Sequence, residues 1–391
     1  MSAATGPLAG LRIIEMAGLG PAPFAAMMLS DMGAEVISVQ PLKGGGDIPL
    51  MNTRFDVLAR GRRYMAIDLK AEGAAAVMLD MIARADGLIE GFRPGVMERL
   101  GLGPEPALAR NPALVFGRMT GWGQDGPLAA RAGHDIDYIA LSGVLGAMGP
   151  RNGPPVVPLN LVGDFGGGGM LLAFGMMCGL WHARASGQGQ VVDAAMTEGS
   201  ALLAAMLWGF RAGGAWDGAR GANLLDGGAP FYGTYECADG GFMAVGAIER
   251  RFFSEFCARM GIDPVPPQDD PMLWPDQRAA IARRFAAHPR AHWEAVFADT
   301  DACVAPVLDW DEAPAHPHNA ARGAFIAPEG VVQPGPAPRF SATPAPIPTP
   351  PATAGAQTRV ILADWGIAAA VVDDLAARGV IAEGADAGAG G

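Results

Sequence analysis

The chain has 391 residues, of which 50% are hydrophobic and 17% charged; this is enough for two or three domains with their own cores and excludes a disordered chain. Its formal net charge of −12 gives no general attraction to nucleic acid or to anionic lipid, so an anionic ligand would need a local basic pocket. The four cysteines are far apart and form no C-x-x-C pair, which favours reduced thiols in a cytoplasmic protein over a metal site or a disulfide framework.

The first third of the chain alternates between apolar runs typical of strands and segments with helical periodicity. We expect helices at residues 23–32 and 72–85, placed between strands at 11–16, 34–39, 64–69, 87–90 and 114–119. The first strand leads into a glycine-rich turn, Ala17–Pro21. Strand–helix–strand repeats of this kind predict an α/β fold with an open, mostly parallel sheet.

Four consecutive glycines, Gly166–Gly169, open an apolar segment that runs to about residue 185. Its most apolar part, residues 169–181, is too short to cross a bilayer, so we expect a buried helix. No secretory signal is visible at the start of the sequence, which also favours a cytoplasmic protein. A strand at 190–193 and a helix at 196–210 complete a large domain that we place at residues 1–213.

The composition changes after this domain. The Gly/Asp-rich residues 214–228 predict a linker, and a hairpin pattern at 233–235 and 242–245 opens a smaller α+β domain at 229–325. Helices are expected in it at 252–260, 276–287 and 292–298. Eight prolines in residues 334–351 predict an extended connector spanning 326–351. Helices at 357–365 and 370–378 (within 352–382) are expected to return to the large domain, ahead of a disordered tail at 383–391.

Two residues stand where acid/base chemistry is plausible. His134 precedes an amphipathic helix, whose dipole favours the neutral imidazole, although a lone histidine is more often structural. Asp164 adjoins the glycine run, either as a helix cap or as a reactive carboxylate. Backbone amides of Gly166, Gly167 and Gly168 could then hold a developing oxyanion.

The basic residues are few, so their clustering is informative. Arg60, Arg62, Arg63 and Lys70 lie around one predicted strand, and Arg93 follows the next. In an acidic chain these are candidates for binding phosphate groups. Glu249 follows the apolar run 243–248, and from the residues alone it is as readily a surface carboxylate.

Several longer sequence motifs resemble those of a known protein family. EGFRPGV (90–96), ERLGLG (98–103) and TGWGQ (120–124) resemble the class III CoA-transferase (CaiB/BaiF-type) superfamily. Within it, AGHDIDYIALSG (132–143), PLNLVGDFGGGGM (158–170) and the segment 220–249 resemble the α-methylacyl-CoA racemases. The resemblance reaches to about residue 381.

This resemblance implies a Rossmann-like large domain with a smaller α+β domain, an interlocked homodimer, and an acyl-CoA thioester as substrate. It implies His134 and Asp164 as the two acid/base residues, supported by Asn160 and Glu249. It also implies CoA contacts at Leu69, Lys70 and Arg93, to which Arg60, Arg63 and Tyr138 are added as candidates. Where close relatives carry a basic residue the chain has Gln40, and Lys43 is its only nearby replacement.

Inverting a carbon next to a thioester carbonyl requires removal of a proton from one face and its return to the other. Two acid/base groups on opposite sides of the carbon can do this through an enolate, with no redox cofactor and no metal. We therefore expect racemisation of 2-methylacyl-CoA thioesters. The alternatives are a class III CoA-transferase with Asp164 as nucleophile, and a regulator that binds a CoA thioester without chemistry.

Overall fold

The computed structural model describes residues 5–42, 53–216 and 219–383. Contacts divide the chain into two compact units: a large unit of residues 1–142, 159–203 and 323–391, and a small unit of residues 143–158 and 204–322. This division differs from the boundaries expected from the sequence, because the chain leaves the large unit twice. Residues 143–158 and 204–213 belong to the small unit, and the proline-rich stretch belongs to the large one.

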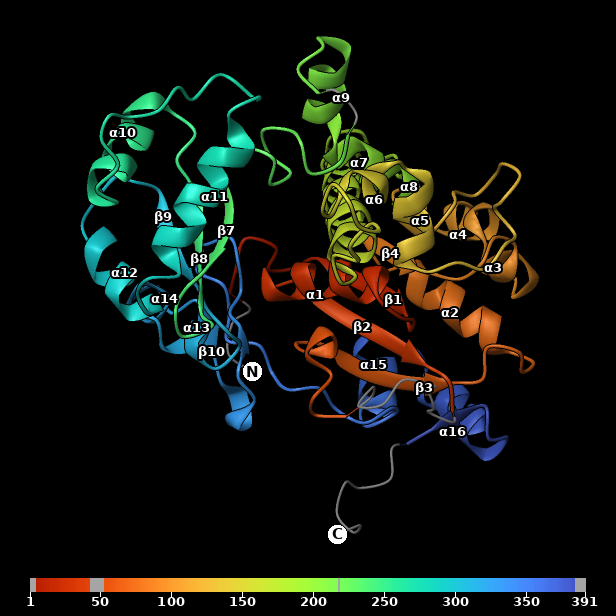
Figure 1. Cartoon of the computed structure of the whole chain (residues 1–391). Coiled ribbons are helices and arrows are strands. Elements are labelled where there is room, and N and C mark those ends of the chain that lie inside the picture. Colours follow the sequence, from red (N-terminus) through yellow and green to blue (C-terminus); the bar gives the residue numbers. More distant parts are fainter. Residues whose placement is uncertain (1–4, 43–52, 217–218, 384–391) are drawn as a thin grey trace. The chain divides into compact units, whose positions relative to one another are not determined.

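The large unit is built on a seven-stranded sheet with the strand order β12-β3-β2-β1-β4-β5-β6. Figure 1 labels β1, β2, β3 and β4 of this sheet. Strands β1 to β6 pair in parallel, and within this sheet only the short edge strand β12 runs antiparallel, to β3. This confirms the predicted α/β class. The strands are β1 (Arg12–Met16), β2 (Glu35–Gln40), β3 (Arg63–Ile67), β4 (Gly87–Glu90), β5 (Val115–Thr120), β6 (Gln190–Ala195) and β12 (Ile381–Ala382).

Helices cover both faces of this sheet, so side chains that alternate along each strand enter two separate cores. Ile14 and Phe116 face the core that includes α2, α15 and α16, whereas Ile13 and Val115 face the core that includes α1 and α7. The helical elements of the large unit are α1 (Pro21–Asp31), η1 (Val57–Ala59), α2 (Ala74–Ile82), α3 (Val96–Arg99), α4 (Pro104–Arg110), α5 (Asp135–Leu141), η2 (Leu161–Met170), α7 (Leu171–Ser186), α8 (Met196–Leu203), η3 (Pro328–Gly330), α15 (Thr358–Asp364) and α16 (Ala369–Ala377).

The end of the described chain closes one side of this unit. α15 lies beside β3, and Trp365 after it is fully buried (Figure 1). The Arg12 guanidinium stacks 3.9 Å from the centre of the Trp365 ring. A second, two-stranded sheet joins β10 (Phe325–Ile326) and β11 (Gln333–Pro334) in the same unit. Residues from 384 onward, where a tail is predicted, lie outside the described residues.

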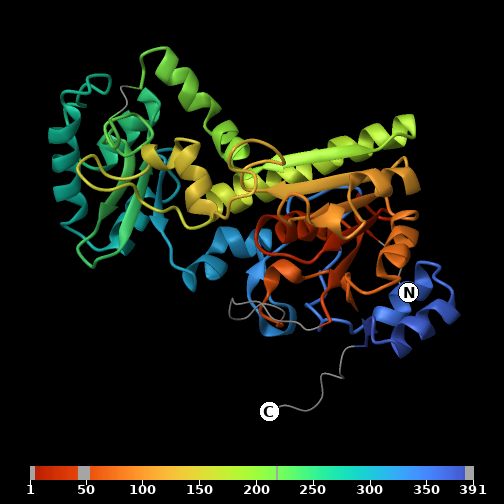
Figure 2. The ribbon, with the colours of Figure 1, turned by 90° about the vertical axis from the view of Figure 1, so that its right-hand side faces the viewer.

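The apolar helix is not buried as the sequence predicts. η2 and α7 form one helical stretch, Leu161–Ser186, whose length and composition alone would allow a membrane crossing; 39% of its most apolar window is buried. One side of α7 packs on β5 and β6 (Figure 2). The opposite side leaves an apolar stripe exposed, formed by Met170, Phe174, Met177 and Trp181. The physical reason is that a helix laid on a sheet buries only one face.

The small unit has an antiparallel sheet in the order β7-β8-β9, whose first two strands form the expected hairpin. Its core is rich in stacked aromatic rings, among them Phe253, Phe256 and Phe285. The elements are α6 (Val144–Ala147), α9 (Ala205–Ala212), β7 (Tyr232–Glu236), β8 (Phe242–Gly246), α10 (Arg250–Arg259), α11 (Trp274–Phe285), α12 (Arg290–Phe297), β9 (Val304–Val307), α13 (Glu312–Ala315) and α14 (Pro317–Arg322).

Two details of this part correct the sequence analysis. The helix predicted at 196–210 is interrupted at Ala204, where the chain passes from the large unit to the small one. The described part of the predicted linker is folded: the Asp226 carboxylate accepts hydrogen bonds from the backbone amides of Gly221, Asn223 and Gly228. Asn223 is only 4% exposed. A carboxylate that satisfies several amides orders a segment whose composition predicts flexibility.

A buried ion pair fixes the loop that follows β4. Glu90 is fully buried; its carboxylate accepts hydrogen bonds from Arg118 Nε at 2.8 Å and from the Phe92 amide at 2.7 Å. Arg118 also pairs with Glu98 at 2.8 Å. Burial raises the pKa of Glu90, so its charge depends on this guanidinium. The network holds the loop that carries Arg93.

We predict that Arg118→Met lowers the free energy of unfolding by about 3–5 kcal/mol, because it leaves a buried carboxylate without its cation. The difference from the wild type should shrink on acidification, since protonation of Glu90 removes the buried charge. Denaturant titration at several pH values measures both effects. Arg110→Met, which breaks the half-exposed pair with Asp80, is the matched control and should cost less than about 1 kcal/mol. Equal losses in the two variants would contradict the prediction.

Candidate active site

The strand order reverses between β1 and β4, and this places a ligand crevice at the carboxyl ends of those strands. In the order β3-β2-β1-β4-β5-β6, the chain continues to one side after β1 and to the other side from β4. Open parallel sheets bind their ligands at such a switch point. The loops there are residues 17–20 after β1 and residues 91–95 after β4. A ligand bound at the switch point would contact these two loops.

Asp164 faces the turn after β1. It lies in η2, and a Cβ atom at position 20 would be only 3.2 Å from its Oδ2 atom. Gly20 also has a φ angle of +67°, which disfavours other residues. The turn thus requires glycine for its backbone conformation and for the close approach of the carboxylate. The predicted acid/base residue lies at the switch point of the sheet.

The surroundings of Asp164 favour its protonated form. Burial, the largest cause, raises its pKa, and the negative charge of Asp135 acts in the same direction. The Asn160 side-chain amide donates a hydrogen bond to Oδ2 at 3.0 Å and opposes the rise, as does the charge of His134. The structure therefore brings Asn160 and Asp164 into direct contact, and places His134 close enough for its charge to affect Asp164.

His134 immediately precedes α5, as predicted, and its side chain is exposed. Its backbone amide donates a hydrogen bond to Asp137 Oδ2 at 2.9 Å, so the first turn of the helix fixes the backbone of the residue. The imidazole is thus held at a helix start while remaining open to a substrate.

Tyr138, a candidate for substrate contact, supports this loop. Its ring is 7% exposed and packs edge-on against Trp122, with ring centres 4.7 Å apart. Its hydroxyl donates a hydrogen bond to the carbonyl of Gly133, the residue before His134. Burial raises the pKa of Tyr138 to about 12. Its position makes it a support for the His134 loop.

The glycine run also has a different use from the expected oxyanion site. Residues 161–170 form a π-helix, in which amides beyond the first turn bond to carbonyl groups of the same helix. The amides of Gly166, Gly167 and Gly168 are consequently engaged. A Cβ atom on Gly167 would lie 2.5 Å from the Ser200 amide nitrogen, and one on Gly168 would lie 2.9 Å from the Pro21 Cβ atom. The glycines permit close packing of η2 between α1 and α8.

Arg60 and Arg63, both expected to bind phosphate, are occupied by the protein itself. Arg60 is 3% exposed; it pairs with Asp31 at 2.6 Å and donates to Gln333 at 2.8 Å. Arg63 bridges Glu35 and Asp364, at 2.7 Å each. Both residues thus stabilise the fold. Every guanidinium nitrogen of Arg60 is bonded within the protein, whereas Arg63 keeps N–H donors beyond its two carboxylate contacts. Arg62 is likewise buried and pairs with Glu15 at 2.6 Å.

The remaining CoA candidates lie at the same edge of the sheet. Arg93 follows β4 and Lys70 follows β3; both side chains are exposed, and within the described ranges neither makes an ion pair. Leu69, half-buried, packs against the core beside Lys70. Gln40 is buried at the end of β2 and donates to Ser38 at 2.9 Å, so it is not available to a ligand. Lys43 lies outside the described residues.

Glu249 belongs to a different unit from these residues. It belongs to the small unit, where it precedes α10 with an exposed side chain, whereas His134, Asn160 and Asp164 belong to the large unit. After burial, its negative charge is the next cause of the raised pKa of Cys303. Within either unit by itself, Glu249 and His134 are not brought together.

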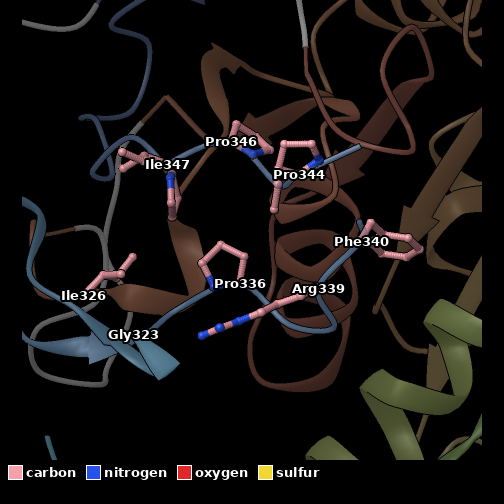
Figure 3. Close-up of a pocket in the computed structure, with 10 residues that line it drawn as sticks. Gly323, Ile326, Pro336, Arg339, Phe340, Pro344, Pro346 and Ile347 are labelled. Carbon is pink, nitrogen blue, oxygen red and sulfur yellow. The ribbon is translucent and has the colours of Figure 1, made fainter. Parts of the chain in front are cut away.

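A pocket of about 350 Å³ lies elsewhere, in the proline-rich stretch of the large unit (Figure 3). Its lining includes Arg339, Phe340 and the rings of Pro336, Pro344 and Pro346, and it contains none of the predicted site residues. In the described part of the chain, no three His, Cys, Asp or Glu side chains are grouped as metal ligands would be.

The fold and the site define an open α/β protein with a carboxylate and an imidazole at its switch point. The chain belongs to CoA-transferase family III, whose profile matches residues 8–358. It is 47% identical over 341 residues to the alpha-methylacyl-CoA racemase of Mus musculus, and 46% identical over 343 residues to that of Homo sapiens; each alignment covers 86% of this chain and 87% of the relative. A CaiB/BaiF family protein from Brucella suis has the same fold, with a TM-score of 0.79 and 23% identity over 92% of this chain and 100% of that one. The family resemblance seen in the sequence is confirmed.

Two residues of the site were missed by sequence reasoning. Gly20 was noted only as part of a turn, and Asp135 was passed over although it directly follows His134. Asp135 accepts hydrogen bonds from the backbone of η2, a contact between segments that no local pattern predicts. The available signal was the aspartate directly after His134. An acidic residue in the first turn of a helix is favoured because its carboxylate can accept hydrogen bonds from unpaired backbone amides near a helix N-terminus.

We predict that Asn160→Ala raises the pKa of Asp164 further, because the amide donates a hydrogen bond to the charged carboxylate. Carbodiimides react with protonated carboxyl groups, so the pH dependence of labelling at Asp164, read by peptide mass spectrometry, reports this pKa. The midpoint should move to higher pH. Asn319→Ala, which removes an amide donor to the Ala313 carbonyl in the small unit, should leave it unchanged. A midpoint that stays or falls in the Asn160 variant would show that the hydrogen bond does not act on Asp164.

Proposed function

We propose that this protein interconverts the two epimers of 2-methylacyl-CoA thioesters. The observation that carries the proposal is the pairing of Asp164, a carboxylate of raised pKa, with His134 at the switch point of a Rossmann-like sheet. The identity of 46–47% to two alpha-methylacyl-CoA racemases over most of the chain supports the same activity.

In this reaction Asp164 and His134 act on opposite faces of the α-carbon. In one direction the Asp164 carboxylate removes the α-proton, which leaves an enolate, and the His134 imidazolium donates a proton to the other face. In the reverse direction neutral His134 removes the proton and protonated Asp164 returns it. Because burial raises the pKa of Asp164, its carboxylate is a stronger base toward the α-proton than an exposed carboxylate. No redox cofactor and no metal takes part in this proton transfer.

The enolate oxygen requires hydrogen-bond donors. The amides of Gly166–Gly168 are engaged within η2, and those of Asp137 and Tyr138 bond to the His134 carbonyl. We therefore assign this role to the amides of Asp135 and Ile136, the first two of α5, beside His134. A donor of this kind contributes about 3–4 kcal/mol to transition-state stabilisation.

The CoA part of the substrate is proposed to bind along the carboxyl edge of the sheet. Arg93 and Lys70 offer exposed cations for its phosphate groups, and half-buried Leu69 offers apolar surface beside Lys70. The Glu90–Arg118 network fixes the loop of Arg93 before the ligand arrives. Because the net charge is −12, this local pair supplies the attraction that the whole chain lacks.

We further propose that the protein acts as an interlocked homodimer in the cytoplasm. The exposed apolar stripe of α7 supports a second copy as its cover, since α7 forms one layer on β5 and β6 and could not enter a bilayer without uncovering them. In such a dimer Glu249 of the partner chain would orient His134 and stabilise its imidazolium. We propose neither a nucleic acid nor a membrane as a partner.

The test is solvent exchange. One epimer of a 2-methylacyl-CoA incubated with the enzyme in deuterated water should yield the other epimer carrying deuterium at the α-carbon, because the protons of Asp164 and His134 exchange with solvent. Epimerisation without label would contradict the enolate mechanism. A parallel incubation with a free carboxylic acid examines the alternative, in which Asp164 attacks the thioester as a nucleophile: a new CoA ester with no α-deuterium would identify a CoA-transferase.

The shared site gives a separate prediction. His134→Ala and Glu249→Ala chains, each inactive alone, should recover about half of the wild-type activity per dimer when co-expressed, because one of the two sites then keeps both residues. Heterodimers can be purified through two different affinity tags. The same pair of tags on two His134→Ala chains is the control and should stay inactive. Inactive mixed heterodimers would place both residues in the site of one chain.

A further inference from the structure

We propose that Asp135 is a positioning residue of the reaction centre. Its buried carboxylate forms hydrogen bonds that connect the segment of His134 to that of Asp164, a connection called the tie below. The proposal rests on the function proposed above, and concerns how the two acid/base residues keep a fixed separation. Asp135 does not touch the reacting carbon; it acts through the backbone of its neighbours.

The need for such a tie follows from the path of the chain. Between His134 and Asp164 the chain leaves the large unit, because residues 143–158 belong to the small unit. It returns at residue 159, five residues before Asp164. The covalent connection between the two residues is thus long and passes through another unit. Their relative position must come from contacts made within the large unit.

Asp135 makes that contact. It is the first residue of α5, and its Oδ2 atom accepts hydrogen bonds from the Gly163 amide at 2.6 Å and the Asp164 amide at 2.8 Å. Both amides lie in the first turn of η2, where no carbonyl of the same helix can accept them. The residue after His134 therefore holds the backbone of Asp164 itself.

The packing around this contact leaves little freedom. Asp135 is 6% exposed. A Cβ atom on Gly163 would lie against Oδ2 and 2.8 Å from Cγ of Asp135, so a larger residue there would displace the carboxylate. The missing side chain of Gly163 thus leaves room for the Asp135 carboxylate, as that of Gly20 leaves room for Asp164.

The carboxylate is also a costly choice for a purely structural tie. Asp135 Oδ1 is buried and has no hydrogen-bond partner in the described protein. An asparagine could accept the same two amides through its oxygen without burying a charge. The charge has an effect at Asp164, where it helps to raise the pKa. The other polar or charged groups that act on Asp164 are His134, Tyr138 and Asn160, and Gly20 on the facing turn carries none.

Three variants separate the tie from the charge. Asp135→Ala removes both, Asp135→Asn keeps the acceptor and removes the charge, and Gly163→Ala keeps the charge and pushes the carboxylate away. Deuterium exchange and epimerisation rates give kcat and KM for each protein, and hydrogen exchange of the peptide covering residues 159–170 reports the two amides without any substrate.

We expect Asp135→Ala and Gly163→Ala to lower kcat by about 100-fold with KM within about threefold, because misplacement of a reacting group affects the chemical step more than binding. In both, the amides of Gly163 and Asp164 should exchange faster. Asp135→Asn should keep their protection. In the direction in which Asp164 removes the α-proton, the rate of this variant should begin to rise at a lower pH than in the wild type. The reason is that loss of the negative charge at position 135 lowers the pKa of Asp164.

Asp239→Asn is the matched control. The Asp239 carboxylate likewise accepts two backbone amides, from Gly241 and Arg290, but in the small unit. This change should leave kcat, KM and the pH limbs as in the wild type. The proposal is overturned if Asp135→Ala keeps kcat within about twofold while folded, or if the amides of η2 stay protected in it. If the wild type itself exchanges no α-proton, the proposed function fails, and the hydrogen-exchange result still decides whether the tie exists.

Discussion

The structure of the reaction centre depends on one constraint: the backbone of η2 must lie in direct contact with α8 and with the start of α1. Gly167 meets Gly199 and Ser200 of α8, and Gly168 meets Pro21 of α1, at distances that admit no Cβ atom. Close backbone approach of this kind requires glycine on at least one side. The wider π-helical turn, which is frequent at functional sites, then carries Asp164 to the turn after β1.

Buried carboxylates hold the loops around this contact. Glu90 fixes the loop after β4 through Arg118, Asp31 fixes Arg60 beside α1, and Asp135 fixes the start of η2. In each case a charged group is removed from water and accepts hydrogen bonds from donors of the protein, which offset the cost of burying it. These contacts hold the loops in place, while His134, Lys70 and Arg93 remain exposed for a ligand.

The division into two units has a consequence for the chemistry. Asp164 and His134 belong to the large unit and Glu249 to the small one, and the apolar side of α7 is uncovered in a single chain. A second copy of the chain accounts for both observations in our proposal. Burial of the apolar stripe would drive association, and the same association would supply the carboxylate that His134 lacks.

The sequence by itself determined the class of fold and the family, and it is the source of the proposal for His134 and Asp164. Short apolar runs that alternate with helical segments indicate the parallel sheet, and the strings around His134 and Asp164 indicate the family, because these signals are local. Tertiary structure decided which cations are free: Arg60 and Arg63 bind Asp31, Gln333 and Asp364, which are distant in the chain, so no local pattern could show that they are occupied. It also decided that the glycine run is used for packing and that Tyr138 supports a loop, because both roles depend on surfaces that exist only after the helices assemble.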